Sequence, residues 1–245
     1  MSTAPSCCTR TPIGATEAVP VEKIASLDTY VTGNKSSKSG IILVYDIFGF
    51  YPQTLLGADK LAEQTGAVTF VPDLLDKVYA EQSWIPPDTD EKKAAFGAFF
   101  TNTAAPPLAL PKLKAWLAEA KTKYPTVEKW GIAGLCWGGK LAVLLSTEGT
   151  EFAVSGQVHP GLYDVADAKA AVIPHICLAS KDESAEVTAG YQAVFAEGSL
   201  GSRADTYPTM HHGWMGARAD LEDAENKKEY ERGYKEIADF FAKYL

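Results

Sequence analysis

The chain has 245 residues, of which 46% are hydrophobic and 22% charged, an ordinary composition for a globular protein. Acidic residues outnumber basic ones, 31 against 23, and no long basic run occurs, so nucleic acid is not an expected partner. The sequence also lacks an apolar run of membrane-helix length and a secretory signal. Its 4 cysteines show no zinc-ligand spacing. We therefore expect a cytoplasmic protein without metal, cofactor or membrane partner.

The first half of the chain predicts the start of an α/β fold. Residues 1–20 contain Pro and Gly without periodicity and predict a surface coil, followed by a single domain over 21–245. The apolar run over 41–45 is typical of a strand buried on both faces. A helix over 53–64 and a strand over 67–71 follow, which together make a βαβ unit.

Residues 76–108 interrupt this alternation. They contain Trp84, two pairs of adjacent prolines and a short helical stretch over 90–100. An insertion of this kind between core elements is a candidate for a lid or a pocket wall.

The alternation of helices and strands then resumes and continues to the end of the chain. Strands are expected over 128–135, 152–158, 175–179 and 203–207, and helices over 111–123, 140–146, 187–197 and 225–244. This order predicts the α/β class, with a mostly parallel sheet between helices in three layers.

The most informative motif is Gly134-Leu135-Cys136-Trp137-Gly138, which lies between a predicted strand and a predicted helix. It has the form of a nucleophile elbow, a turn so sharp that side chains two positions before and after the nucleophile would collide. The positive end of the following helix favours a thiolate over a thiol. The motif therefore predicts that Cys136 is a nucleophile rather than a small buried core residue.

A cysteine nucleophile needs a base and an orienting acid, and both have candidates after later strands. Asp182 and Glu183 follow the strand over 175–179, while His211 and His212 follow the strand over 203–207. Ligand crevices in open parallel sheets form at these strand ends. Asp182 could instead cap a helix, with Glu183 taking its place, and only one of the two histidines can be the base.

These residues resemble the dienelactone hydrolase (carboxymethylenebutenolidase) family of the α/β-hydrolase superfamily. The matching pieces run in family order over residues 40–245: Asp46-Ile47-Phe48-Gly49, Val71-Pro72-Asp73, the elbow 134–139, Asp182 and His212-Gly213-Trp214. The cysteine elbow together with the early Asp-Ile-Phe-Gly separates this family from serine esterases of the same fold.

The resemblance implies a catalytic triad of Cys136 as nucleophile, His212 as base and Asp182 as the acid that orients it. It also implies an oxyanion hole formed by the backbone amides of Ile47 and Trp137. The acidic residue of the early motif, here Asp46 in place of the glutamate of the best-known members, would support the thiol.

The resemblance further concerns the substrate. Familiar members hold a substrate carboxylate with two arginines, but residues 76–108 contain none, so an apolar ester or lactone is expected. Candidate substrate-binding residues are Phe48, Trp84, His159, Trp214 and Arg218.

The expected function is hydrolysis of an ester or enol-lactone through a thioester on Cys136, by a monomer or weak homodimer. Two alternatives remain open from the sequence. One is a biosynthetic cyclase or transesterase that uses the same triad, and the other is a non-catalytic relative with the same fold.

Overall fold

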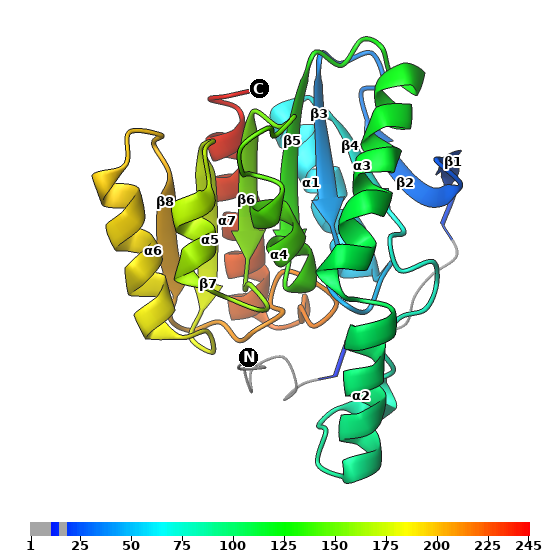
Figure 1. The fold of residues 1–245 in the computed structure, drawn as a ribbon, viewed down its shortest axis with the longest axis vertical. Helices are drawn as coiled ribbons and strands as arrows, with labels where there is room; N and C mark the ends of the chain where they lie inside the picture. Colours follow the sequence, from blue (N-terminus) through cyan, green and yellow to red (C-terminus); the bar gives the residue numbers. More distant parts are fainter. Residues whose placement is uncertain (1–10, 15–18) are drawn as a thin grey trace.

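The computed structural model describes residues 11–14 and 19–245, so the expected coil over 1–20 lies largely outside the described residues. The central feature is a sheet with strand order β1-β2-β4-β3-β5-β6-β7-β8 (Figure 1). Its strands are β1 (Glu22–Ile24), β2 (Leu27–Gly33), β3 (Ser39–Val44), β4 (Val68–Pro72), β5 (Lys129–Leu135), β6 (Val154–Val158), β7 (His175–Ser180) and β8 (Arg203–Tyr207). The prediction of a mostly parallel sheet between helices is confirmed.

The pairing of the strands explains where a site can form. Strands β1, β2 and β4 pair in antiparallel fashion, whereas all pairs from β4 to β8 are parallel. The register places Leu135 opposite Val158, Val158 opposite Leu178, and Ser180 opposite Tyr207. The parallel strands therefore end together, and the residues that follow them meet at one edge of the sheet.

Helices cover both faces of the sheet, which gives the expected three layers. Figure 1 shows α7 behind the sheet and α3 and α4 in front of it. The helices are α1 (Pro52–Thr65), α2 (Asp90–Asn102), α3 (Pro106–Lys123), α4 (Trp137–Leu144), α5 (Val165–Ala170), α6 (Ala185–Glu197) and α7 (Ala224–Phe241), with a short 3₁₀ helix, η2 (Gln82–Trp84). Over the described ranges, no helix is both long and apolar enough to cross a membrane. The cytoplasmic location stays a prediction.

Two helices begin at least three residues earlier than the sequence predicted. Helix α3 begins at Pro106, in the segment expected to break the alternation, because proline fits the first turn of a helix, where the amide has no partner. Helix α4 begins at Trp137, directly after the elbow, rather than at residue 140. The short elements β1, η2 and α5 were not predicted, since three to six residues carry too little periodicity.

The core is built from buried strands and a layer of aromatic rings. Residues Ile41 to Val44 are completely buried, as the continuous apolar run predicted. The ring of Phe70 packs on those of Trp116, Tyr124 and Trp130 at centroid distances of 4.8–5.5 Å. A rigid platform of this kind holds the strand ends in fixed positions.

The interrupting segment over 76–108 contains η2 and α2, and Figure 1 shows α2 projecting beyond the edge at which the parallel strands end. The two elements pack together through Trp84 and Phe99, whose ring centroids are 5.9 Å apart. The segment thus lies at the edge of the sheet that carries the elbow. Its role as a lid or pocket wall stays a prediction.

A buried histidine at the opposite edge makes folding sensitive to pH. His175 is fully buried, its Nδ1 lies 2.8 Å from Ser155 Oγ, and burial lowers its pKa to about 3. An unfolded histidine titrates near pH 6.5. Between these values the unfolded chain takes up a proton that the folded chain does not, so stability falls as pH decreases below about 6.5.

We predict that replacing this group removes part of the pH dependence. From pH 7.5 to pH 5, the free energy of unfolding of the parent should fall by about 2 kcal/mol more than that of His175→Gln. Urea denaturation at the two pH values measures this difference. Equal losses in the two proteins would show that His175 is not buried in its neutral form.

Candidate active site

The turn after β5 has the geometry of a nucleophile elbow. Cys136 has backbone angles φ 52° and ψ −110°, which a residue with a side chain rarely adopts. A Cβ at Gly134 would lie 2.0 Å from the carbonyl oxygen of Gly138, and a Cβ at Gly138 would lie 2.3 Å from that of Val44. Only glycine fits at both positions, which is the steric reason expected for this motif.

Cys136 is held between β6 and the start of α4. Its amide donates to the carbonyl of Val158 at 3.0 Å, and its carbonyl accepts from the amide of Gly161 at 3.0 Å. Helix α4 begins at the next residue, so its positive end directly follows Cys136; stabilisation of a thiolate by this helix stays a prediction. Only 2% of the residue is exposed, so Cys136 lies in an enclosed place.

A histidine and a carboxylate form a buried pair at the same sheet edge. Nδ1 of His212 lies 2.6 Å from Oε1 of Glu183, and the two side chains are 1% and 2% exposed. The other carboxylate oxygen of Glu183 accepts a hydrogen bond from the amide of Ser180. A carboxylate on Nδ1 fixes the ring and leaves Nε2 as the nitrogen available for proton transfer.

The acid on the ring is not the one that the sequence selected. Asp182 is exposed, and its Oδ2 accepts instead from the backbone amide of His212 at 2.9 Å. Asp182 does not cap a helix either, because Ser184 provides the cap of α6. Two adjacent residues in a turn point in different directions, and the longer Glu183 points inward. The sequence predicted that Asp182 contacts the imidazole of His212, and the structure instead places Glu183 at this contact.

The second histidine has a separate role. Nε2 of His211 lies 3.2 Å from the carbonyl oxygen of Arg218, so this ring braces the loop between β8 and α7. The geometry thus agrees with the choice of His212 rather than His211 as the candidate base.

Asp46 joins two of the loops at this edge. Its carboxylate accepts from the amide of Phe48 through Oδ1 and from that of Ala217 through Oδ2, each at 3.0 Å. Burial raises the pKa of Asp46, while the nearby charge of Arg218 and the amides lower it. The structure thus shows Asp46 tying the loop after β3 to the loop that carries His212. Support of the thiol stays a prediction.

The two backbone amides expected to form an oxyanion hole follow two neighbouring strands, and the oxyanion hole itself stays a prediction. Ile47 lies in the loop after β3, and Trp137 is the first residue of α4, directly after the nucleophile. Among the described residues, neither amide donates to a backbone carbonyl. Such amides can stabilise a developing oxyanion.

The candidate substrate-binding residues fall into two groups. Phe48 and Tyr51 help to line a cavity of about 650 Å³, whose remaining wall is residues 77–83. Trp84 follows this wall and is half-buried. Trp214, by contrast, stacks on Tyr207 with centroids 4.4 Å apart and is completely buried, and its contact with a substrate stays a prediction.

The guanidinium of Arg218 is already engaged with the protein. It lies over the ring of Phe48, 4.8 Å from the centroid, and the residue is 2% exposed. Its charge also lowers the pKa of the buried Asp46. These contacts give Arg218 a structural task, and a role in substrate binding stays a prediction.

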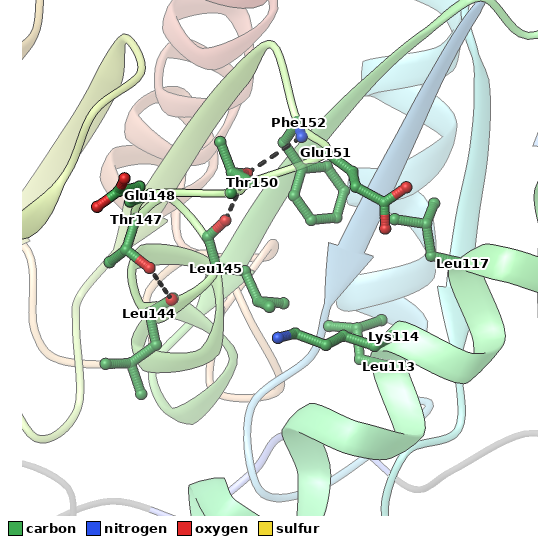
Figure 2. Close-up of a pocket in the computed structure, with 11 residues that line it drawn as sticks. Leu113, Lys114, Leu117, Leu144, Leu145, Thr147, Glu148, Thr150, Glu151 and Phe152 are labelled. Atoms are coloured by element: carbon green, nitrogen blue, oxygen red, sulfur yellow. Dashed lines mark hydrogen bonds between the residues drawn. The ribbon is translucent and has the colours of Figure 1, made fainter.

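A smaller cavity lies away from this site. Its volume is about 130 Å³, and it is formed between α3 and residues 144–152, at the edge where the parallel strands begin. Figure 2 shows leucine side chains from α3 and from the end of α4 around it, with hydrogen bonds of Thr147 and Thr150 in the neighbouring turn. It holds no part of the nucleophile elbow.

His159 belongs to the site by position. It directly follows β6, and its ring packs against that of His212 with centroids 5.0 Å apart. The next loop residues reach the nucleophile, because a Cβ at Gly161 would lie 3.3 Å from Sγ of Cys136. This placement agrees with the expectation that His159 lies at the crevice. From the sequence no role was predicted for Gly161, for which the only signal was its position after Pro160.

Comparisons with known proteins agree with this architecture. A dienelactone hydrolase from Anabaena variabilis has a TM-score of 0.64 at 14% identity, covering 96% of this chain and 100% of that one. A dienelactone hydrolase-like promiscuous phosphotriesterase from metagenomic libraries also scores 0.64, at 15% identity, covering 94% of this chain and 99% of that one. At these identities the likeness shows the fold.

Sequence comparisons establish the family. Two uncharacterized AIM2 family proteins of Schizosaccharomyces pombe are 34% and 35% identical over 223 residues, which are 90% of this chain and 89% of each relative. The model of the dienelactone hydrolase family matches residues 27–245, nearly the whole described chain. The chain therefore belongs to the dienelactone hydrolase family.

Proposed function

We propose that the protein hydrolyses uncharged esters or lactones with Cys136 as nucleophile, His212 as base and Glu183 as the orienting acid. The observation that carries the proposal is the buried contact of 2.6 Å between His212 and Glu183 at the sheet edge that also carries a cysteine in the elbow conformation. A strained nucleophile and a desolvated imidazole–carboxylate pair both lower the stability of the fold. Groups with this effect occur mainly at catalytic sites.

The reaction proceeds in two steps. The thiolate of Cys136 attacks the carbonyl carbon, and the oxyanion is stabilised by the amides of Ile47 and Trp137. The C–O bond breaks, the alcohol leaves with a proton from the imidazolium of His212, and a thioester remains. His212 then takes a proton from water, the resulting hydroxide attacks the thioester, and the acid and the thiolate are released. Glu183 holds the ring in the required tautomer in both steps.

The arginines support an uncharged substrate. Arg203 pairs with Asp205 and Glu236, Arg232 pairs with Glu229, and Arg218 lies over Phe48. Every arginine within the described residues thus has a partner in the protein. A carboxylate-bearing substrate held by an arginine would need one of these contacts to break, whereas a neutral ester does not.

The assignment of the nucleophile can be tested with two cysteine variants. Cys136→Ala should lower kcat/KM on short p-nitrophenyl esters by at least about 1,000-fold, because the acyl-enzyme cannot form. Cys177→Ala is the matched control: Cys177 is also buried, but burial raises its pKa to about 12 and it lies in mid-strand. An unchanged rate in Cys136→Ala, or an equal loss in both variants, would refute the assignment.

The assignment of the acid can be tested with a second pair. Glu183→Gln should reduce kcat by about 100-fold or more, because an amide does not stabilise the imidazolium and favours another tautomer. Asp182→Asn should reduce kcat by less than about 10-fold, because its oxygen can still accept from the amide of His212. Steady-state kinetics on one ester measures both, and the reverse order of effects would restore Asp182 as the acid.

A further inference from the structure

His159 is the buried polar side chain of the site that the triad does not use. It is completely buried, and within the described chain neither of its ring nitrogens has a hydrogen-bond partner. A buried polar atom without a partner typically costs about 1–3 kcal/mol. Eight other buried side chains of the described residues each have one polar atom in this condition, whereas His159 has two, which calls for a reason.

The backbone of this residue is strained as well. His159 has φ 36°, in the left-handed region that residues with side chains avoid, and its amide donates to the carbonyl of Leu178 at 2.8 Å. This hydrogen bond fixes the start of the loop on the neighbouring strand β7. The ring of His159 is thereby held against His212 instead of turning toward solvent.

The ring is neutral in this position. Burial lowers the pKa of His159 well below its usual value, and the nearby His212, Arg218 and His211 lower it further. A neutral imidazole offers one N–H donor and one nitrogen acceptor. It suits an uncharged oxygen-bearing group better than an anion, which would gain more from a cation.

The loop of His159 also borders the space at the sulfur. The amide of Gly161 donates to the carbonyl of Cys136, and its Cα is so close that an added Cβ would lie 3.3 Å from Sγ. Cys136 and His212 are as enclosed as His159, at 2% exposure each. The loop that begins at His159 therefore lies directly against the sulfur to which an acyl group would be attached.

We propose that His159 is a specificity-determining residue that hydrogen-bonds an uncharged oxygen substituent, such as a hydroxyl or an ether oxygen, on the acyl part of the substrate. This inference rests on the proposed function and narrows its substrate class to esters or lactones with an oxygen atom near the scissile carbonyl. When such a substrate binds, it satisfies a ring nitrogen that is otherwise buried without a partner.

The test compares two esters whose acyl groups have equal length, p-nitrophenyl methoxyacetate and p-nitrophenyl butyrate. The methoxyacetyl group has an ether oxygen where the butyryl group has a methylene. In His159→Ala, the ratio of kcat/KM for methoxyacetate to that for butyrate should fall by about 10-fold relative to the parent. Dividing the ratio of kcat/KM values in the variant by that in the parent cancels the difference in intrinsic reactivity between the two esters. His159→Asn, which retains a donor and an acceptor and tolerates the left-handed backbone, should recover part of the ratio.

The outcomes separate the inference from the function on which it rests. A parent that hydrolyses both esters, with the same ratio in His159→Ala, overturns the role of His159 and leaves the proposed function intact. An equal loss on both esters also overturns it, since that result indicates a purely structural residue. A parent that hydrolyses neither ester overturns both. Circular-dichroism melting of each variant verifies folding, and His159→Phe, which keeps a ring but has no hydrogen-bond donor or acceptor, supplies the ratio if His159→Ala fails to fold.

Discussion

The site depends on one backbone constraint, the left-handed turn at Cys136 between β5 and α4. The turn places the sulfur above the sheet edge, starts a helix directly beside it and leaves the amide of Trp137 without a backbone acceptor in the described chain. The turn is possible only because Gly134 and Gly138 have no side chains, which would collide with the backbone of Gly138 and of Val44, respectively. The strain at the nucleophile is thus sustained by the close approach of α4 to the ends of β5 and β3.

Buried polar groups tie together the loops at this sheet edge. Asp46 links the loop after β3 to the loop after β8, and Glu183 and Asp182 link the loop after β7 to the same segment. Each of these carboxylates accepts at least one backbone amide, which partly compensates the burial of Asp46 and Glu183; Asp182 is exposed. His159 is the exception, because its ring lacks such compensation within the described residues. We interpret that difference as the distinction between groups that build the site and a group that binds substrate.

Much of this could be predicted from the sequence. The period of apolar residues predicted the parallel sheet, and the elbow motif predicted the position of Cys136, because both patterns follow directly from backbone sterics. The choice between Asp182 and Glu183 could not be predicted, since it depends on the direction in which each side chain leaves a short turn. The burial of Trp214 could not be predicted either, because it follows from packing on Tyr207 and on α7, which depends on how the irregular loop between β8 and α7 folds.

The central claim is that the acyl group passes through the sulfur of Cys136. Rapid mixing of His212→Ala with a p-nitrophenyl ester, followed by an acid quench and peptide mass spectrometry, tests it most directly, because loss of the base slows hydrolysis of the thioester. The account predicts one acyl group, removable by hydroxylamine, on the peptide that contains Cys136. An acyl group on another side chain, or turnover by the parent with Cys136 never modified, would contradict it.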